Sequence, residues 1–334
     1  MYQRLSYIIL TILLLSCSKS ETPVNVMNKM SVTPYTEVMT KSLVDNISIR
    51  EKSVGIQITD FSGTSIYENN PNNNIARLKY TTNWLIDDGA DNAIDVILTS
   101  LNAKIYGWYP YSTEITGTGE SAFLSIDIAG EREPDQMTDY LWCAQSKTEP
   151  AGSLNINCSN PDVNLRMNHA LSLIAFVIYK DGYEGDGVLS KFEIIDNSIT
   201  PSIRVNKEGI NNLQMKLTDG SITGGDMVSN ATVNNINSTI SLSVDPGLDP
   251  AILFNQKNCH ILFPPMSINN RSNLEFRFYI DGLKYYVSLE GSETITYESG
   301  NIYVYKAKLS PRMIDITGVV EWQTINYEVG SGYN

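Results

Sequence analysis

Cys17 is the residue whose surroundings point most directly to a chemical modification. It follows Leu14-Leu15-Ser16 at the end of a short apolar run that begins at Tyr7, and Arg4 precedes that run. A basic start, a short apolar core and small residues before a cysteine are typical of a bacterial lipoprotein signal. We therefore predict that residues 1–16 are removed and that Cys17 is lipidated, which would anchor the chain through acyl chains. The run is too short for a membrane helix, which needs ~20 apolar residues.

A second candidate for chemistry is the pair Cys143 and His169, because a thiol beside an imidazole can act as a nucleophile. Only the presence of the two residues supports this idea, and His169 lies inside an apolar run, where a structural role is favoured. The sequence contains no G-x-S-x-G elbow, no P-loop and no G-x-G-x-x-G at the start of a helix. We therefore predict a protein that is not an enzyme and binds no cofactor.

The acidic loop at 181–187 and the cysteines contain residue types that can bind metal ions. The loop, DGYEGDG, carries three carboxylates, but their spacing is not that of an EF-hand, so a solvated hairpin loop is favoured over a calcium site. Cys143, Cys158 and Cys259 have no zinc-site spacing and only two histidines accompany them. They are predicted to be buried apolar side chains, with one disulfide as the alternative in an oxidising compartment.

Composition narrows the class of protein further. The chain has 334 residues, enough for about two domains of ~150 residues, and 42% of them are hydrophobic. The net charge of −13 argues against nucleic acid as a partner, because nucleic-acid binding needs clustered Lys and Arg. The 19 tyrosines against 8 phenylalanines favour half-buried strands, where the ring packs and the hydroxyl stays hydrated.

Short strands separated by turn residues dominate the pattern, and no long amphipathic helix is apparent. Asp281-Gly282 between two alternating segments predicts a hairpin with a type I′ turn. The continuous apolar run at 168–179 is predicted to be one buried strand. Further strands are expected at 30–40, 53–59, 83–86, 93–100, 104–111, 123–128, 189–195, 213–217, 239–244, 260–263, 274–280, 283–289 and 301–309. The segment 139–145 is ambiguous between strand and helix. The fold class is therefore all-β, with two β-sandwich domains.

The domain organisation follows from these elements and from the shift to Pro, Gly, Ser and Asn near 150–165. We predict a signal peptide at 1–16, a tether and N-terminal strand at 17–41, a first β-sandwich at 42–160 and a second at 161–334.

Several stretches together make the chain similar to fimbrillins, the subunits of type V pili on the surface of Gram-negative anaerobes. The lipobox LLSC ends at Cys17, and YGWYPYS at 106–112 resembles the "YYPYS" signature of that family. The remaining stretches that carry the resemblance are MSVTPYTEVMTKS at 30–42, SVGIQITD at 53–60, DYLWCAQSK at 139–147, MNHALSLIAFVIYK at 167–180 and GNIYVYKAKLSPRMIDITGVVEW at 300–322. The resemblance covers nearly the whole chain.

This resemblance implies two transthyretin-like β-sandwich domains and assembly by strand exchange. The subunit would reach the outer membrane and the cell surface as a lipoprotein, and a trypsin-like protease would remove its N-terminal strand. By position, cleavage is expected between Lys41 and Ser42, with Arg50 and Lys52 as alternative sites. A strand of another pilus subunit, of the same or another kind, would then fill the groove.

The segment 319–327 is the candidate donor strand, with Val320, Trp322 and Thr324 on one face; an ordinary edge strand of the second domain is the alternative. Lys41 departs from the arginine that is commonest at the processing site. The chain could therefore also be a permanently lipidated pilus anchor. Another reading is a surface lipoprotein that binds glycans or proteins through the Trp and Tyr of 104–111, although that stretch also matches the family signature and is expected in the core.

Overall fold

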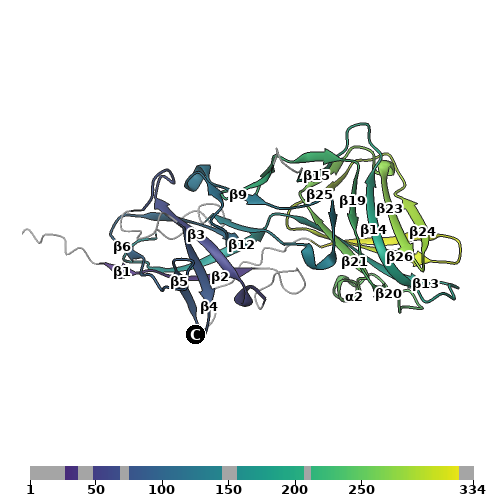
Figure 1. Cartoon of the computed structure of the whole chain (residues 1–334), viewed down its shortest axis with the longest axis horizontal. Coiled ribbons are helices and arrows are strands. Elements are labelled where there is room, and N and C mark those ends of the chain that lie inside the picture. Colours follow the sequence, from purple (N-terminus) through teal and green to yellow (C-terminus); the bar gives the residue numbers. More distant parts are fainter. Residues whose placement is uncertain (1–26, 37–47, 68–74, 145–155, 207–211, 323–334) are drawn as a thin grey trace, which may run out of the picture.

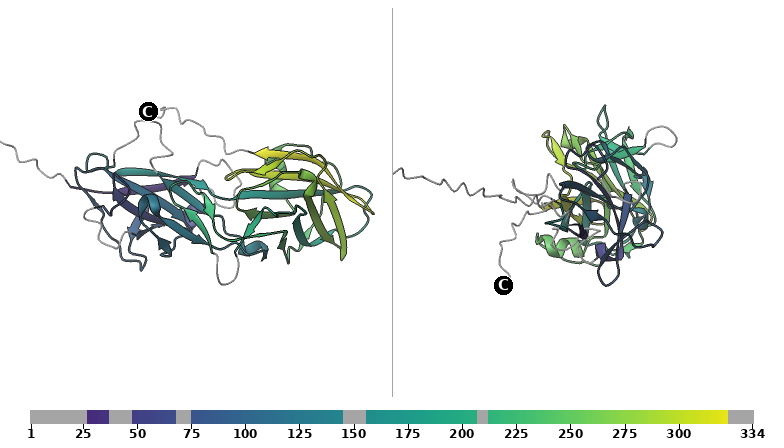
Figure 2. Two further views of the ribbon diagram at one scale, coloured as in Figure 1. Left: turned by 90° about the horizontal axis from the view of Figure 1, so that it is seen from above. Right: turned by 90° about the vertical axis from the view of Figure 1, so that its left-hand side faces the viewer.

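The structure, a computed structural model, describes residues 27–36, 48–67, 75–144, 156–206 and 212–322. Within them nearly every element is a β-strand, so the predicted all-β class is confirmed. The strands gather into two lobes along the long axis of the molecule (Figure 1). The same elongated arrangement is visible from above, with the N-terminal strands at one end and the yellow C-terminal strands at the other (Figure 2). Two lobes of packed sheets are consistent with the expected pair of transthyretin-like β-sandwiches.

The N-terminal lobe is built on one sheet of seven strands, counted within the described residues. Their order across the sheet is β2 (Ser31–Thr36), β12 (Asp162–His169), β11 (Leu141–Ala144), β7 (Ala103–Tyr109), β3 (Ser53–Asp60), β4 (Ile75–Tyr80) and β5 (Trp84–Asp87). A small pair, β1 (Asn28–Lys29) with β6 (Ile97–Leu98), lies beside it. The pairing of β2 with β12 is parallel, whereas the other pairings in this sheet are antiparallel.

Two facing sheets form the C-terminal lobe. The first contains β10 (Glu131–Arg132), β19 (Asn230–Val233), β14 (Val188–Asp196), β23 (Leu274–Ile280) and β24 (Leu283–Ser288), with β20 (Ser238–Thr239) also paired to β14. The second has the order β21 (Cys259–Phe263), β13 (Ser172–Lys180), β26 (Ile302–Leu309) and β27 (Ile314–Trp322). Phe176 of β13 packs between the sheets, with ring centroids 4.8 Å from Phe276 and 5.3 Å from Tyr305.

Smaller elements connect and cover the main sheets. A four-stranded sheet has the order β17 (Ile222–Thr223), β16 (Leu213–Lys216), β9 (Phe123–Ile126) and β8 (Ile115–Thr116), and two pairs join β15 (Ile203–Val205) to β18 (Asp226–Val228) and β22 (Met266–Ile268) to β25 (Ile295–Tyr297). The described helices are short: η1 (Ser48–Glu51), η2 (Gly119–Ser121), η3 (Pro134–Gln136), α2 (Pro250–Asn255) and η4 (Arg271–Asn273).

Strand pairing connects the two halves of the sequence in both directions. β12 comes after residue 160 in the chain but belongs to the sheet of the N-terminal lobe. Conversely, β9 and β10 precede residue 160 but pair with β16 and β19 from the second half. The boundary at 160/161 therefore stays a prediction, and the chain crosses between the lobes more than once.

Packing in the N-terminal lobe depends on a glycine opposite a tryptophan. Trp108 is fully buried, and its indole lies over Gly55 of β3, the strand paired with β7. A Cβ atom at position 55 would lie 2.1 Å from Cε2 of that indole, so any side chain there would displace the ring. The Trp108 indole N–H donates to the carbonyl of Ser112, which satisfies its polar group.

Most predicted strands have counterparts in the structure, and the ambiguous segment 139–145 contains a strand, β11. The hairpin is confirmed: Asp281 and Gly282 have φ values of 51° and 76°, as a type I′ turn requires. The run 168–179 is not one strand, because β12 ends at His169 and β13 begins at Ser172, where the chain passes between lobes. The strands expected at 93–100 and 239–244 were overextended, since only Ile97–Leu98 and Ser238–Thr239 make ladder pairs.

Candidate functional site

β2 is an edge strand whose side chains fill the core of the N-terminal lobe. Its burial alternates: Val32, Pro34 and Thr36 are buried, whereas Ser31 and Thr33 are exposed. Met30, just before the strand, is also buried, with 2% of its surface exposed. Met30 and Val32 join one apolar cluster with residues of β3, β7 and β12. An N-terminal segment of a few residues therefore supplies one wall of the core.

β12 is the acceptor strand on which β2 lies (Figure 1). The two strands run parallel, with Val32 opposite Val163, Pro34 opposite Leu165 and Thr36 opposite Met167. β12 alternates in the same way, so its buried residues are Val163, Leu165, Met167 and His169. Parallel partners require a long connection, and here the two strands are separated by most of the N-terminal lobe. Register and direction are thus defined by matched buried positions on both strands.

Pro34 blocks the outer edge of β2. The Ser31 N–H donates to the carbonyl of Pro161, at 2.9 Å, so Ser31, Thr33 and Tyr35 direct their N–H groups toward β12. The backbone groups of the alternate residues, including Pro34, face away from β12, on the side where no described strand pairs with β2. Proline has no N–H to offer there, and proline on an edge strand is a common device against further pairing. Pairing of a further strand on that side of β2 is therefore disfavoured at Pro34.

The segment before β2 is attached to the lobe by polar contacts. The Met30 N–H donates to the Val96 carbonyl at 2.9 Å, and the Asn28 side-chain amide donates to the Cys158 carbonyl. Lys29 pairs with Asp95, both largely exposed. These polar groups can bond to water when the segment leaves. The buried face of β2 supplies the apolar contacts.

The predicted processing site lies just after β2. Cys17, Lys41 and Ser42 lie outside the described residues. The alternative site Arg50 is exposed in η1, with its guanidinium carbon 5.3 Å from the centroid of the Tyr80 ring. The neighbouring Ile49 is buried at 1% exposure, and the Lys52 N–H donates to its carbonyl. Cleavage at Arg50 would therefore cut a packed turn directly before β3.

β27, which contains the first part of the candidate donor segment, is the edge strand of the second sheet in the C-terminal lobe. It pairs antiparallel with β26, with Val320 opposite Val304 and Trp322 opposite Ile302. Val319 is 46% exposed, and Val320 is only partly buried. Thr324 lies outside the described residues. Val320 and Trp322 thus lie in this chain's own sheet, at the less buried end of the strand.

A salt bridge holds a loop over the bulge between β26 and β27. Lys306 is 5% exposed, and its ammonium donates to both carboxylate oxygens of Asp245 at 2.6 and 2.8 Å. These bonds, with one from the Gly247 N–H, hold the pKa of the Asp245 carboxyl below its usual value. Near the same bulge, a Cβ atom at Gly318 would lie 2.7 Å from the Leu248 side chain.

The aromatic side chains of β7 lie in the hydrophobic core, as the match to the family signature implied. They do not form a surface on which a glycan could stack. Tyr106 is 1% exposed, Trp108 is fully buried and Tyr109 is 9% exposed. The Tyr106 hydroxyl donates to the Glu120 carboxylate at 3.0 Å. Stacking on a sugar needs an accessible ring face. The interpretation of this stretch as an exposed binding surface is therefore wrong.

His169 and Cys143 are buried on neighbouring strands, β12 and β11. The His169 imidazole Nδ1 lies 2.8 Å from the Asp139 carboxylate, and both side chains are buried. Cys143, Cys158 and Cys259 are all buried, and none forms a disulfide with another described residue. Burial raises the pKa of the Cys259 thiol, which keeps it protonated.

The acidic loop at 181–187 is attached to the hairpin turn between β23 and β24. The Asp281 carboxylate accepts hydrogen bonds from the Tyr183 hydroxyl and from the N–H groups of Gly187 and Val188, at 2.7 to 2.8 Å. The Lys180 ammonium donates to the Gly185 carbonyl. In the described part of the chain, no group of three or more His, Cys, Asp or Glu side chains could hold a metal ion.

Sequence reasoning identified β2 but not its acceptor. Val163 and Leu165 lie in the region near 150–165 whose Pro, Gly, Ser and Asn predict a domain boundary, and Met167 begins the next stretch, so the sequence predicts no strand across them. Nothing in the local pattern indicates that these residues pair in parallel with a strand near the N-terminus.

The comparison with protein families identifies the chain. The model of the fimbrillin-like family matches residues 51–326, which is most of the sequence, so the chain belongs to the fimbrillin-like family. The match begins after β2 and after the predicted processing site. No curated protein matches the chain.

Solved structures with the same fold share little sequence with the chain. A candidate cell adhesion protein of Bacteroides ovatus is 12% identical, with a TM-score of 0.56 over 88% of this chain and 98% of its own. A similar protein of Bacteroides uniformis is 10% identical, with a TM-score of 0.54 over 90% and 100%. A fimbrial protein of Bacteroides vulgatus is 10% identical, with a TM-score of 0.51 over 88% and 99%. None of the helices among the described residues is long and apolar enough to cross a membrane.

Proposed function

We propose that this protein is a structural, non-enzymatic subunit of a cell-surface pilus, exported as a lipoprotein through Cys17 and assembled by strand exchange. Membership of the fimbrillin-like family supports the role of pilus subunit. The observation that carries the assembly mechanism is β2: a short N-terminal edge strand whose alternate side chains fill the core of the lobe.

Removal of β2 would create a binding site for another strand. The departure of Met30, Val32 and Pro34 would leave the buried face of β12 without cover and its ladder groups unpaired. Burial of one such side chain stabilises by about 1.5 to 3 kcal/mol, so the vacated groove carries about 5 kcal/mol of apolar affinity. A strand of another subunit with apolar residues at alternate positions would recover this free energy and the ladder hydrogen bonds.

Proteolysis between Lys41 and Ser42 is the proposed trigger. A trypsin-like protease at the outer membrane would separate β2 from the lobe and release it together with the lipidated N-terminus. Cleavage at this position leaves the buried turn at Ile49 intact, unlike cleavage at Arg50. Until then, β2 covers the groove and Pro34 prevents pairing with a further strand.

The segment 319–327, with Val320, Trp322 and Thr324, remains the proposed donor. Its first residues pair with β26 within the chain, so donation requires either that the end of β27 detaches or that the exchanged residues begin after Trp322. Detachment is favoured at this end, because Val319 and Glu321 are exposed whereas Ile314, at the start of β27, is buried.

A permanently lipidated anchor is the second candidate function, because lysine stands at the proposed site in place of the commoner arginine. In that case β2 would stay in the sheet and the subunit would accept no donor. The anchor would still offer its own donor segment to the next subunit.

N-terminal sequencing with intact mass measurement of the protein from the cell surface distinguishes the two. A chain that starts at Ser42 supports the exchanging subunit, and a diacylated Cys17 with an uncut chain supports the anchor. In vitro, we expect protease-trimmed protein to form polymers and a Lys41→Gln variant to stay monomeric under the same treatment. Polymers of equal length from the Lys41→Gln variant would contradict the proposed trigger.

A further inference from the structure

A cavity opens at the seam between the two sheets of the C-terminal lobe, away from β2. It lies between the end of β19, the turn η3 and the residues that connect α2 to β21, and it has a volume of about 240 Å³. Sites for drug-sized molecules begin at about 300 Å³, so this cavity suits a smaller ligand. The strands on its two sides are not joined by a ladder, because β19 and β21 belong to different sheets.

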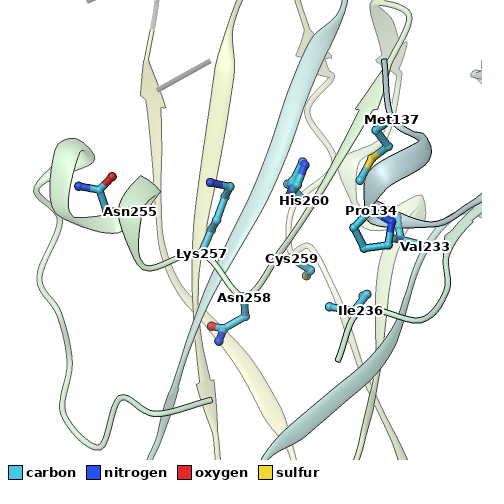
Figure 3. Close-up of a pocket in the computed structure, with 9 residues that line it drawn as sticks. All are labelled: Pro134, Met137, Val233, Ile236, Asn255, Lys257, Asn258, Cys259 and His260. Atoms are coloured by element: carbon cyan, nitrogen blue, oxygen red, sulfur yellow. The ribbon is translucent and has the colours of Figure 1, made fainter. Parts of the chain in front are cut away.

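One wall of the cavity is apolar. Pro134, Met137, Val233 and Ile236 line it and appear together on the right of Figure 3. Val233 belongs to the core of the lobe, and Met137 and Ile236 pack against that core. The wall therefore continues the hydrophobic interior to the surface, where it can bury an apolar group of a ligand.

The opposite wall carries hydrogen-bond donors and positive charge. His260 stands between the two walls, and its imidazole Nε2 is buried without a hydrogen-bond partner among the described residues. The Lys257 ammonium lies 4.1 Å from the centroid of the Phe254 ring and donates to the Phe254 carbonyl. A buried nitrogen without a partner costs free energy. A turn of the imidazole toward the cavity would expose Nε2 to a ligand oxygen, and the new hydrogen bond would offset that cost.

Arg132 does not line the cavity, but it adds a buried positive charge close enough to act on His260. It is 5% exposed, its Nη2 donates to the Leu262 carbonyl of β21 at 2.8 Å, and its Nε has no hydrogen-bond partner in the described part of the chain. It makes no ion pair within 4 Å with a described carboxylate, although Asp127 partly offsets the lowering of its pKa. Buried charges in proteins are normally paired, because an isolated one is expensive. The positive charge of Arg132 therefore favours an anion in this neighbourhood.

We propose that the cavity binds a carboxylate with an apolar body, its oxygens received by His260 on the cationic wall and its body by Met137 and Ile236. A short aliphatic acid and the C-terminal carboxylate of a peptide that ends in an apolar residue share this chemistry. The proposal is independent of strand exchange, since no residue of the cavity belongs to the seven-stranded sheet.

The pKa values of the basic groups near the cavity agree with the binding of a carboxylate. Burial, with Lys257 and Arg132 nearby, lowers the pKa of the His260 imidazole to about 4, so the ring is neutral at neutral pH. Burial also lowers the pKa of Arg132 to about 10. A bound carboxylate opposes both effects, because a nearby negative charge favours the protonated forms.

The chain contains two histidines, so imidazole NMR of the full chain with ¹⁵N-labelled histidine reports directly on the site. We expect hexanoate to shift the His260 signals with a dissociation constant on the order of 1 mM, to raise the pH midpoint of His260 and to leave His169 unchanged. Hexanol keeps the body without the charge, and acetate keeps the charge without the body. Each is expected to bind at least about tenfold more weakly.

Variants on the exposed side of the cavity test the charge. Lys257→Gln should weaken hexanoate binding about three- to fivefold, and Asn255→Asp, at an exposed position, should weaken it through repulsion. Lys284→Gln makes the same charge change on exposed β24 and should have no effect. N-acetyl-leucine tested against hexanoate identifies the source: tighter binding of the former indicates a peptide C-terminus, and of the latter a free acid.

Three results would overturn the proposal. The first is that hexanoate leaves His260 unshifted at concentrations of about 10 mM. The second is equal binding of hexanol and hexanoate, which would show a purely apolar cavity. The third is an equal loss of affinity in the Lys257→Gln and Lys284→Gln variants.

Discussion

The strands β2 and β27 both lie at the edge of a sheet, yet they are attached to the molecule in opposite ways. β27 follows β26 through a tight turn, closed by a bond from the Ser310 N–H to the Met313 carbonyl, and pairs with it in an antiparallel hairpin. β2 pairs in parallel with β12, which lies far away in the sequence. One cut in the connection after β2 makes that strand a separate chain, whereas β27 stays tethered by its hairpin.

Burial differs in the same direction. β2 inserts Val32, Pro34 and Thr36 into a core, whereas the end of β27 places Val319 in solvent and buries Val320 only partly. An edge strand such as β2 can therefore be freed by one cut of the backbone and still contribute much of the stability of its lobe. Such a strand is suited to replacement, because its site keeps a high affinity for a substitute.

The largest expected effect comes from deleting β2. A chain that begins at Ser42 loses the burial of Met30, Val32 and Pro34, so its N-terminal lobe should lose about 5 kcal/mol of unfolding free energy. Urea denaturation followed by Trp fluorescence measures the change. A synthetic peptide with the sequence of 27–40 should restore the stability, and the same peptide with aspartate at position 32 should not.

A chain that ends at Gly318 is the matched control for that deletion, since it removes the described end of the other edge strand. It should lose only about 1 to 2 kcal/mol, because Val319 and Glu321 are exposed and Val320 is only partly buried. Equal losses in the two truncated chains would contradict the difference between the strands.

Two single substitutions, one in β2 and one in β27, should show the same difference in stability with smaller effects than the truncations. Val32→Asp places a carboxylate in the core and should cost about 3 to 4 kcal/mol, whereas Val319→Asp lies in solvent and should change stability by about 0.5 kcal/mol or less. Thermal unfolding of both variants measures the difference. If Val319→Asp proved as damaging as Val32→Asp, the end of β27 would have to be packed in solution.

The smallest effect concerns pH and the loop over the β26–β27 bulge. The pKa of Asp245 is lowered from 3.8 by Lys306, so its contribution to stability is complete above about pH 4 and is lost as pH falls through the lower, folded value. The Asp245→Asn variant should therefore be less stable than the wild type at pH 7 and approach it near pH 2. Acid titration of the denaturation midpoint tests this, and an unchanged gap between pH 7 and pH 2 would contradict it.

Local signals in the sequence predicted local structure well. Asp281-Gly282 predicted the hairpin because a type I′ turn depends only on the φ values of its two central residues. The alternation of 30–40 and 53–59 predicted β2 and β3, because period-two burial is a property of a single strand. The run 168–179 was misread as one strand, since apolar continuity does not show where a chain leaves one sheet for another.

The all-β class, the family resemblance and the N-terminal strand could be predicted from the sequence alone, because they depend on composition, periodicity and short motifs. The parallel pairing of β2 with β12, the direction of the Pro34 backbone away from β12 and the burial of Trp108 over Gly55 emerge only in the folded chain. The fold also brings His260 and Arg132 to one seam between sheets. These features depend on contacts between residues far apart in the chain, which side-chain packing selects and no local pattern encodes.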